Sequence, residues 1–217
     1  MTGRLAYYLG TSYRRKRVDA DLEANRRYLA GRVLDIGGGR ARGRFRPPAS
    51  ARWLVTDLAL RPGTDVGGDV HALPFQDGVF DAIKASEIFE HVRDVAAALA
   101  ECRRVLRAGG YLVATVPFLE RVHGDPDDFG RLTHAKWEEL LTGAGFNVVT
   151  IAPQGGFYTH LAGLLRFLVL RAPVGLRHLG YLAFPLLDLL ARVDDLPVAA
   201  RGDFAAFVGG YLIIASR

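Results

Sequence analysis

The sequence predicts an α/β fold, an open and mostly parallel sheet with helices on both faces. Short apolar runs typical of buried strands alternate along the chain with stretches of helical periodicity. The 217 residues, 50% hydrophobic and 24% charged, suit one globular domain with a substantial core. Because alternating strands and helices favour parallel pairing, helices should cover both faces of the sheet.

An amphipathic helix is predicted before the first strand, over residues 18–30, where Val18, Leu22 and Leu29 fall near one face. The strands that follow are short, apolar and separated by glycine or proline. In chain order they are expected at residues 32–36, 51–58, 79–86, 111–118, 147–152 and 207–216.

Two further helices are predicted between these strands. Residues 94–107 should form a helix that is closed by Gly109–Gly110 and has arginines near its negative end. Thr133 should open the next helix, which is expected to end near Gly143 or Gly145.

Residues 157–193 depart from the alternation of strands and helices. Pro173 and Pro185 are expected to break this segment into short helices. We interpret it as a helical insertion before the last strand that forms a lid, a dimer surface or, with arginines among its leucines, a membrane contact. The apolar residues at helical spacing are Phe157, Leu161, Leu164, Leu165 and Leu168, followed by Leu179, Leu182, Leu186 and Leu190.

The formal net charge of +5 is unevenly distributed. Residues 1–61 contain 14 Lys and Arg residues against 5 Asp and Glu residues. This basic third of the chain can contact nucleic acid, anionic lipid or a phosphorylated substrate, or it is simply a solvated arginine-rich surface. Since nothing in the sequence resembles a nucleic-acid-binding motif of stacked aromatic residues among basic ones, nucleic acid is not the expected partner.

Composition also bears on location and metal binding. The N-terminus lacks the apolar region of a signal peptide, so secretion is not expected, and a membrane-spanning helix is not expected either. A cytoplasmic location follows, with association at a membrane surface as the alternative. The single cysteine, Cys102, lies on a helical apolar stripe and is expected to be a buried structural thiol, and no metal site is predicted.

The first candidate site is Asp35 and the glycines 37–39 at the end of the first strand. Glycines there let the backbone approach a ligand where a Cβ atom would clash. A dinucleotide-binding loop would read G-x-G-x-x-G and open a helix. Here the acid precedes the glycines, and the chain runs into Pro47–Pro48, which is a poor helix start. This arrangement favours a different ligand.

Two aspartates further along the chain describe an adenosine site. Asp57 ends the second strand, where its carboxylate can accept both hydroxyls of a ribose, although enzymes that bind nicotinamide dinucleotides place an acid similarly and a turn-capping role is the alternative. Asp69 begins the string DVHALPF and can accept a hydrogen bond from an adenine amino group. Together the two acids leave no place for a second nucleotide.

As an ordered set, these motifs resemble the class I S-adenosylmethionine-dependent methyltransferases, particularly the type 11 or ubiquinone-methyltransferase-like branch. The segments that carry the resemblance are VLDIGGG, VTDLA, DVHALPFQDGVFDAI, EIFEHV and ECRRVLRAGGYLVATVP, over roughly residues 30–150. The resemblance implies a Rossmann-like sheet of seven strands, whose last strand is antiparallel and is inserted from a hairpin with the sixth.

The resemblance also implies S-adenosylmethionine as cofactor. Asp57 would hold its ribose, Leu58 would lie beside the adenine, and Ser86 would lie near the methyl donor. One position departs from the family, because Ala41 stands where a further glycine is usual, and Arg40 or Arg42 would then contact the cofactor carboxylate. The implied cofactor-binding residues are Asp35, Gly37, Gly38, Gly39, Asp57, Leu58, Asp69, Val70, Ser86 and Glu87.

Candidate catalytic residues follow the strands that end near Ser86 and Pro117. His123, in a loop rich in His, Asp and Arg, is the first choice as base or acceptor contact, and Asp128 and Arg131 either take part or brace the loop as an ion pair. The loop resembles an H-x-x-P-x-D-[FY]-x-R-[FY]-T segment of type 11 enzymes. His91 is a second candidate, with a structural role as its alternative.

The N-terminal segment has its own alternatives. Tyr7, Tyr8 and Tyr13, with Arg14, would either fold over the cofactor pocket, where aromatic faces attract a sulfonium, or pack as part of an N-terminal helix.

The chain is therefore interpreted as one methyltransferase domain, residues 1–217. It divides into an N-terminal helical segment (1–30), a cofactor-binding core (31–152), a helical insertion (153–200) and the last strand (204–217). We expect the methyl group to be transferred to an oxygen atom of a small-molecule, glycan-like or lipid-like acceptor. The expected partners are a hydrophobic acceptor, a membrane surface that the protein contacts peripherally, and a second copy of the chain in a homodimer. The alternatives are an NAD(P)-binding oxidoreductase and a non-catalytic adenosine-binding module whose basic surface contacts RNA or lipid.

Overall fold

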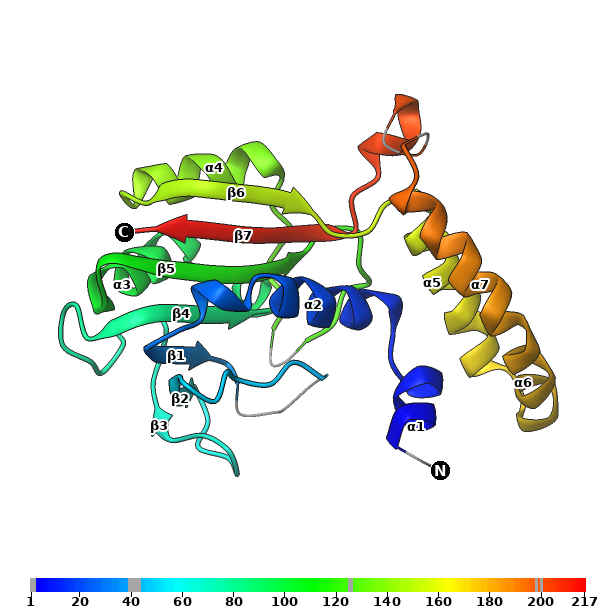
Figure 1. Ribbon diagram of the computed structural model, residues 1–217, viewed down its shortest axis with the longest axis horizontal. Coiled ribbons are helices and arrows are strands. Elements are labelled where there is room, and N and C mark those ends of the chain that lie inside the picture. The colour runs from blue at the N-terminus through cyan, green and yellow to red at the C-terminus, as the bar shows by residue number, and fades with distance from the viewer. Residues whose placement is uncertain (1–2, 39–43, 125–126, 198, 200) are drawn as a thin grey trace.

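The computed structural model of the protein describes residues 3–38, 44–124, 127–197, 199 and 201–217. Its strands are β1 (Arg32–Ile36), β2 (Arg52–Asp57), β3 (Val66–Gly67), β4 (Phe80–Ser86), β5 (Leu106–Pro117), β6 (Asn147–Pro153) and β7 (Gly210–Ser216). Within the described residues they form one sheet in the order β3-β2-β1-β4-β5-β7-β6, and β7 runs antiparallel between β5 and β6 (Figure 1). The predicted seven-stranded, mostly parallel sheet with an inserted last strand is confirmed.

The helices are α1 (Gly3–Gly10), α2 (Tyr13–Ala24), α3 (Val95–Val105), α4 (His134–Gly143), α5 (Phe157–Arg171), α6 (Val174–Gly180) and α7 (Phe184–Arg192). Short 3₁₀ turns are η1 (Arg26–Tyr28), η2 (Phe89–His91), η3 (Tyr181–Ala183), η4 (Val193–Asp195) and η5 (Gly202–Ala206). Helix α2 crosses one face of the sheet, and α3 and α4 lie on the other (Figure 1).

The strand sequences explain this two-sided packing. Successive side chains of a strand point to opposite faces, so a central strand that is apolar throughout buries both faces. In β1, Val33 belongs to the apolar cluster that contains Val18 and Leu22 of α2, whereas Leu34 belongs to the cluster that contains Leu99 of α3. A continuous run of hydrophobic residues therefore requires helices on both sides.

Three helices begin at a polar residue that accepts a hydrogen bond from the first turn. Ser12 caps α2, Asp94 caps α3 and Thr133 caps α4, each through its side-chain oxygen. Such caps satisfy backbone N–H groups that have no partner inside the helix. The predicted start of α4 at Thr133, and its end at Gly143, are confirmed.

Some boundaries differ from the prediction. The helix expected at 18–30 begins at Tyr13, because Ser12 caps it, and ends at Ala24, although Val18, Leu22 and Leu29 are buried as predicted. The Gly109–Gly110 pair lies within β5 rather than closing α3, since β5 already pairs with β4 at Leu106. The two-residue strand β3 was not predicted, being too short to show a pattern.

Cys102 is fully buried, as predicted, and burial raises the pKa of its thiol to about 12. Because the thiolate is the reactive form, the native protein should react with a disulfide reagent such as DTNB at pH 8 about a thousandfold more slowly than an exposed thiol. The rate of thionitrobenzoate release measures this. The chain unfolded in guanidinium serves as the control and should be labelled once, whereas rapid labelling of the native protein would show that the thiol is accessible.

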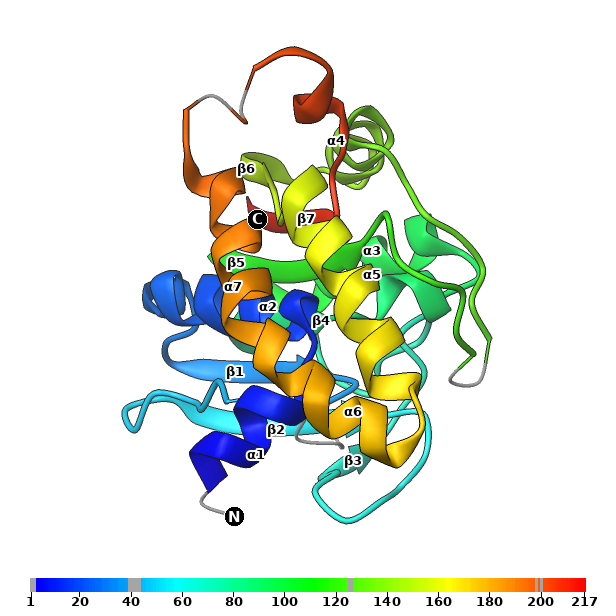
Figure 2. The same ribbon diagram turned by 90° about the vertical axis from the view of Figure 1, so that its right-hand side faces the viewer.

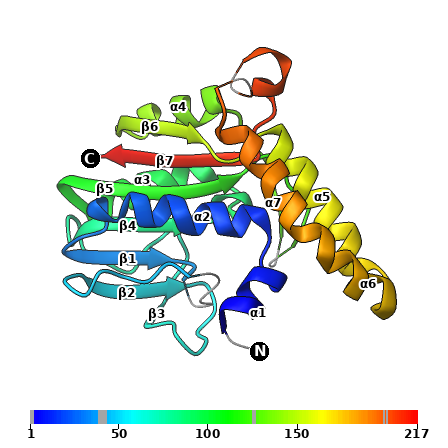
Figure 3. The same ribbon diagram turned by 45° about the vertical axis from the view of Figure 1, so that its right-hand side comes forward.

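Residues 157–195, here called the helical hairpin, stand beyond the C-terminal ends of the parallel strands, with α5 and α7 side by side (Figure 2) and α6 at the far tip (Figure 3). The hairpin is attached to the N-terminal helices through Asp188, which accepts hydrogen bonds from the hydroxyls of Tyr8 (2.6 Å) and Tyr13 (2.7 Å). The guanidinium of Arg166, a buried residue, lies 3.9 Å from the ring centroid of Phe184 and ties α5 to α7.

The hairpin exposes much of its apolar surface to solvent. Pro185 does not break the helix, because it occupies the first turn of α7, where it costs no hydrogen bond. Val174–Asp195 therefore forms a helical stretch that is, by length and composition, long and apolar enough to cross a membrane. Such a stretch was not expected from the sequence. Only 11% of its most apolar window is buried. Apolar residues of the hairpin with 39–74% exposure are Leu164, Leu165, Phe167, Leu168, Val174, Leu176, Leu179, Leu182, Leu186 and Leu189.

Candidate functional site

A cavity of about 850 Å³ opens at the C-terminal ends of β1, β2 and β4. The connection reverses direction between β1 and β4, and ligands of open α/β sheets bind at such a switch point. We call this space the first cavity. The predicted cofactor residues that line it are Asp35, Gly37, Gly38, Asp57, Leu58, Asp69, Val70, Ser86 and Glu87. Gly39, Arg40, Ala41 and Arg42 lie outside the described residues.

The two described glycines of the loop have no room for a side chain. Gly37 has a φ of +71°, and a Cβ atom there would lie 1.9 Å from the Cδ1 atom of Ile88. A Cβ atom on Gly38 would lie 2.5 Å from the Asp35 carboxyl group. The backbone conformation therefore favours glycine at the first position, and the fixed Asp35 carboxyl group favours it at the second.

Asp35 holds the loop in place. Its buried carboxylate accepts hydrogen bonds from Lys84 Nζ (2.7 Å) and Trp53 Nε1 (3.2 Å), which come from the two strands on either side of β1. Because both oxygens are engaged, Asp35 acts as a positioning residue behind the glycines, although it also lines the cavity.

Asp57 and Asp69 present carboxylates to the cavity. Asp57 makes one long bond, 3.4 Å from Ala59 N to its Oδ1. Asp69 Oδ1 accepts from His71 N (2.9 Å) and contacts the His71 ring (2.6 Å), and these bonds hold the pKa of Asp69 below its usual range. Both bonds use Oδ1, so Oδ2 is the oxygen available to a ligand. Leu58 adds an apolar surface, 68% exposed, beside them.

His71 also lines the cavity, although sequence reasoning assigned it no role. It stands two residues after Asp69 in the DVHALPF string, and this proximity in sequence could have identified it as a site residue. Its ring orients the Asp69 carboxylate, and its Nε2 accepts from Asp94 N at 3.4 Å.

Glu87 also lines the first cavity. Its φ of +56° is uncommon for a residue with a side chain, and such conformations concentrate at functional sites. Its carboxylate receives two bonds from Arg14, at 2.8 Å and 2.7 Å. Ser86, beside it, is held by a 2.8 Å bond between its hydroxyl and that of Thr115.

A second cavity, of about 510 Å³, lies between α2, α5 and the residues that follow β5 and β6. Arg14 lines this second cavity while its partner Glu87 lines the first, so their ion pair stands between the two spaces. Sequence reasoning missed this cavity because its walls are distant along the chain.

The N-terminal tyrosines pack against the protein. Tyr7 donates to Asp19 (2.6 Å), and Tyr8 and Tyr13 donate to Asp188. None of these three tyrosines is among the described residues that line the first cavity. The contacts support the packing alternative rather than a cover over the cofactor.

The predicted catalytic residues divide into two groups. His91 lines the first cavity, and its ring centroid lies 5.2 Å from that of His123. Asp128 instead receives a bond from Arg131 Nη2 (2.7 Å) and one from His123 N (2.9 Å). This pairing favours the interpretation that Asp128 and Arg131 brace the loop and do not touch a substrate.

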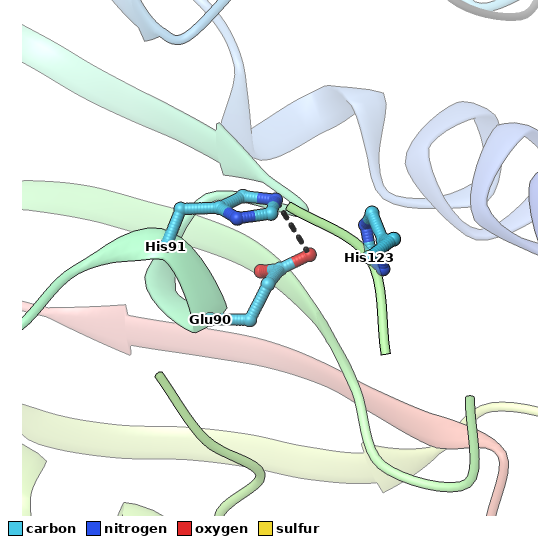
Figure 4. Close-up of side chains that lie close together, drawn as sticks. All are labelled: Glu90, His91 and His123. Carbon is cyan, nitrogen blue, oxygen red and sulfur yellow. Dashed lines mark ion pairs between the residues drawn. The ribbon is translucent and has the colours of Figure 1, made fainter. Parts of the chain in front are cut away.

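Glu90 lies beside the two histidines, although it was not among the predicted catalytic residues. It is 4% exposed, and its carboxylate lies beside the His91 ring, on the side toward His123 (Figure 4). Burial, and then the neighbouring Glu87 carboxylate, raise the pKa of Glu90 well above its usual range. The sequence offered the adjacent Glu90–His91 pair, but only the fold brings His123 to it.

Comparisons with known proteins agree with this geometry. Residues 34–114 match a family described as "Methyltransferase domain". The demethylmenaquinone methyltransferase of Thermotoga maritima is 34% identical over 122 residues, 50% of this chain and 52% of that protein. The chain thus spans about half or less of the length of the curated relatives it matches.

Solved structures share the fold over nearly the whole chain. A S-adenosylmethionine-dependent methyltransferase from Archaeoglobus fulgidus superposes with a TM-score of 0.57 at 18% identity, covering 99% of this chain and 98% of that one. The [4+2]-cyclase SpnF gives a TM-score of 0.57 at 19% identity, covering 93% and 81%. At such identities the likeness establishes the fold, and the cyclase shows that the fold alone does not fix the reaction.

Proposed function

Starting from the methyltransferase domain that this chain contains at residues 34–114, we propose that the protein is a S-adenosylmethionine-dependent methyltransferase. One observation carries the proposal: residues from four separate segments line a single cavity at the switch point of the sheet. Asp57 would bind the ribose hydroxyls, Asp69 the adenine amino group, and the glycines would lie under the methionine part.

The reaction we propose is an in-line displacement. A lone pair of the acceptor oxygen forms a bond to the methyl carbon, while the carbon–sulfur bond breaks and its electrons go to sulfur, giving S-adenosylhomocysteine. The protein's main contribution is to align the two reactants, which can supply roughly 7–11 kcal/mol. The acceptor hydroxyl also loses a proton, and we expect the cluster of Glu90, His91 and His123 to assist this loss.

For the acceptor we propose a hydrophobic small molecule that enters from the side of the helical hairpin. The second cavity adjoins the cofactor cavity through the Arg14–Glu87 pair, and Leu164 and Phe167 of α5 contribute to its wall. An apolar acceptor would gain the most binding free energy from contact with this wall, because its apolar surface would be removed from water.

We further propose that the hairpin rests on the cytoplasmic surface of an anionic membrane, from which a lipid-like acceptor would be taken. Residues 140–187 contain no Asp or Glu but include Arg171 and Arg177, so the exposed leucines of this stretch lie near cations. This charge suits anionic lipid headgroups. The bonds from Tyr8 and Tyr13 to Asp188, which lies within the candidate span, favour a hairpin that lies on the surface.

Calorimetry tests the proposed activity. S-adenosylhomocysteine should bind with a stoichiometry of one per chain, whereas NADH and a short RNA should give no heat of binding. The second and third titrations distinguish the oxidoreductase and the RNA-binding alternatives. Failure of well-folded protein to bind S-adenosylhomocysteine would overturn the proposal.

A further inference from the structure

Three potential metal ligands meet beside the first cavity. Glu90 and His91 belong to η2, and His123 comes from the segment after β5 (Figure 4). One donor atom from each lies within 4.8 Å of the other two, and Glu90 Oε1 is 3.7 Å from His91 Nε2. Two imidazoles and one carboxylate are a donor set of catalytic zinc sites.

Each imidazole has one ring nitrogen beside a backbone carbonyl. His91 Nδ1 bonds to the carbonyl oxygen of Asp127, and His123 Nδ1 lies 3.2 Å from that of Arg121. A carbonyl oxygen can only accept, so each Nδ1 is the donor, and in the neutral form of each ring the lone pair lies on Nε2. Metal-binding histidines are held in this way, with the second nitrogen donating to a carbonyl or carboxylate.

The Glu90 carboxylate lacks a partner. Its side chain is 1% exposed, and neither oxygen has a hydrogen-bond donor within the part of the chain that the structure describes. The two arginines whose charges act on Glu90 are already paired, Arg14 with Glu87 and Arg131 with Asp128. A buried carboxylate without hydrogen bonds or a counter-ion is costly.

The scaffold around the three ligands is fixed by bonds that do not involve their donor atoms. The carbonyl of Glu90 accepts from Phe129 N at 2.8 Å, which joins η2 to the loop after β5. Asp128, held by Arg131, accepts from His123 N at 2.9 Å. The ion pair that braces the loop therefore also places the His123 ring.

From this geometry we propose that Glu90, His91 and His123 bind one divalent transition-metal ion, Zn²⁺ in the first instance. Ligands that lie about 2.0–2.2 Å from zinc in a tetrahedron are roughly 3.3–3.5 Å apart, so side-chain movements on the order of 1 Å would close the site. Three protein ligands leave a fourth position open. If the proposed methyl transfer is correct, that position would take the acceptor oxygen and lower its pKa, and the acceptor proton would pass to solvent.

Cobalt substitution provides a direct test. Full-length protein is treated with EDTA, exchanged into metal-free buffer and titrated with Co²⁺, whose visible bands are intense in tetrahedral sites. We expect one Co²⁺ per chain, displaced by Zn²⁺. Glu90→Gln and His123→Ala should each weaken Co²⁺ binding by at least about a hundredfold, since each removes one of three ligands. His178→Ala, which removes an exposed imidazole of the hairpin, is the matched control and should bind as the parent does.

Two outcomes would overturn the proposed metal site. One is the absence of tetrahedral Co²⁺ bands in the parent protein, and the other is equal Co²⁺ affinity in the parent and in Glu90→Gln. Circular dichroism checks the fold of each variant, and Glu90→Gln keeps the shape of the side chain if His123→Ala fails to fold. S-adenosylhomocysteine binding is measured in parallel. Metal binding without S-adenosylhomocysteine binding would refute the proposed function alone, and the reverse would refute the metal site alone.

Discussion

Replacing Asp57 with alanine should weaken S-adenosylhomocysteine binding by at least tenfold, measured by calorimetry. The proposed bonds from the two ribose hydroxyls to the carboxylate are charge-assisted, and each is worth about 1.5–3 kcal/mol. Water will replace part of that energy in the variant, yet a loss of only about 1.4 kcal/mol already lowers affinity tenfold. In the structure the carboxylate makes one long bond, to Ala59 N, so the substitution should cost little stability.

The control for this experiment is Asp77→Ala. Asp77 is another aspartate on the surface, its side chain 75% exposed, and it pairs with Arg104 outside the cavity. An exposed ion pair contributes about 0–1 kcal/mol to stability, so this variant should fold and bind as the parent does. Unchanged affinity in Asp57→Ala would show that the ribose does not lie at the end of β2, although the cavity itself could still be the cofactor site.

The triple substitution Leu179→Ser, Leu182→Ser, Leu186→Ser should abolish binding to anionic membranes. These leucines follow one face of the hairpin and are 65%, 74% and 68% exposed. Burying one leucine side chain contributes about 1.5–3 kcal/mol, so the three together should lower the partition onto vesicles by at least a hundredfold. Flotation with vesicles of equal parts phosphatidylcholine and phosphatidylglycerol measures this partition, and vesicles of phosphatidylcholine alone should bind the parent less.

Leu60→Ser is the matched control, because Leu60 is 74% exposed but lies after β2, far from the hairpin in the sequence. The triple variant should keep its fold, since the altered side chains face solvent. Vesicle binding equal to that of the parent would refute the membrane proposal. A second result would also refute it: the parent protein does not bind vesicles but forms a dimer in sedimentation equilibrium, and the triple variant does not form that dimer. The leucine face would then be covered by a second copy of the chain.

Much of the lining of the first cavity could be predicted from local sequence. Asp57 follows the end of its strand directly, and Asp69 stands in a compact string, so their places depend mainly on where parallel strands end. The glycines were found for the same reason, since a positive φ and close packing at Gly37 leave few alternatives to glycine. The segment around Gly39 lies outside the described residues, and its role stays a prediction.

The acceptor side could not be predicted to the same extent. Glu90 and His123 are brought together by the order of strands and by the bond from Phe129 N to the Glu90 carbonyl, neither of which has a sequence signature. The second cavity is likewise lined by α2 and α5, which are separated by more than a hundred residues in the sequence. The leucines of the hairpin showed helical spacing, but spacing does not tell whether an apolar face packs inward, and here much of it faces solvent.

By itself, then, the sequence determined the α/β sheet, because hydrophobic periodicity is a local property of the chain. Its strand-end motifs carried the resemblance to the methyltransferase family, and that resemblance implied the inserted antiparallel strand. Only the tertiary structure decided which polar groups meet. It brought Glu90 together with His91 and His123, paired Arg14 with Glu87 between two cavities, and left many leucines of the helical hairpin exposed. Contacts between distant segments depend on how the layers pack, and no local pattern records that packing.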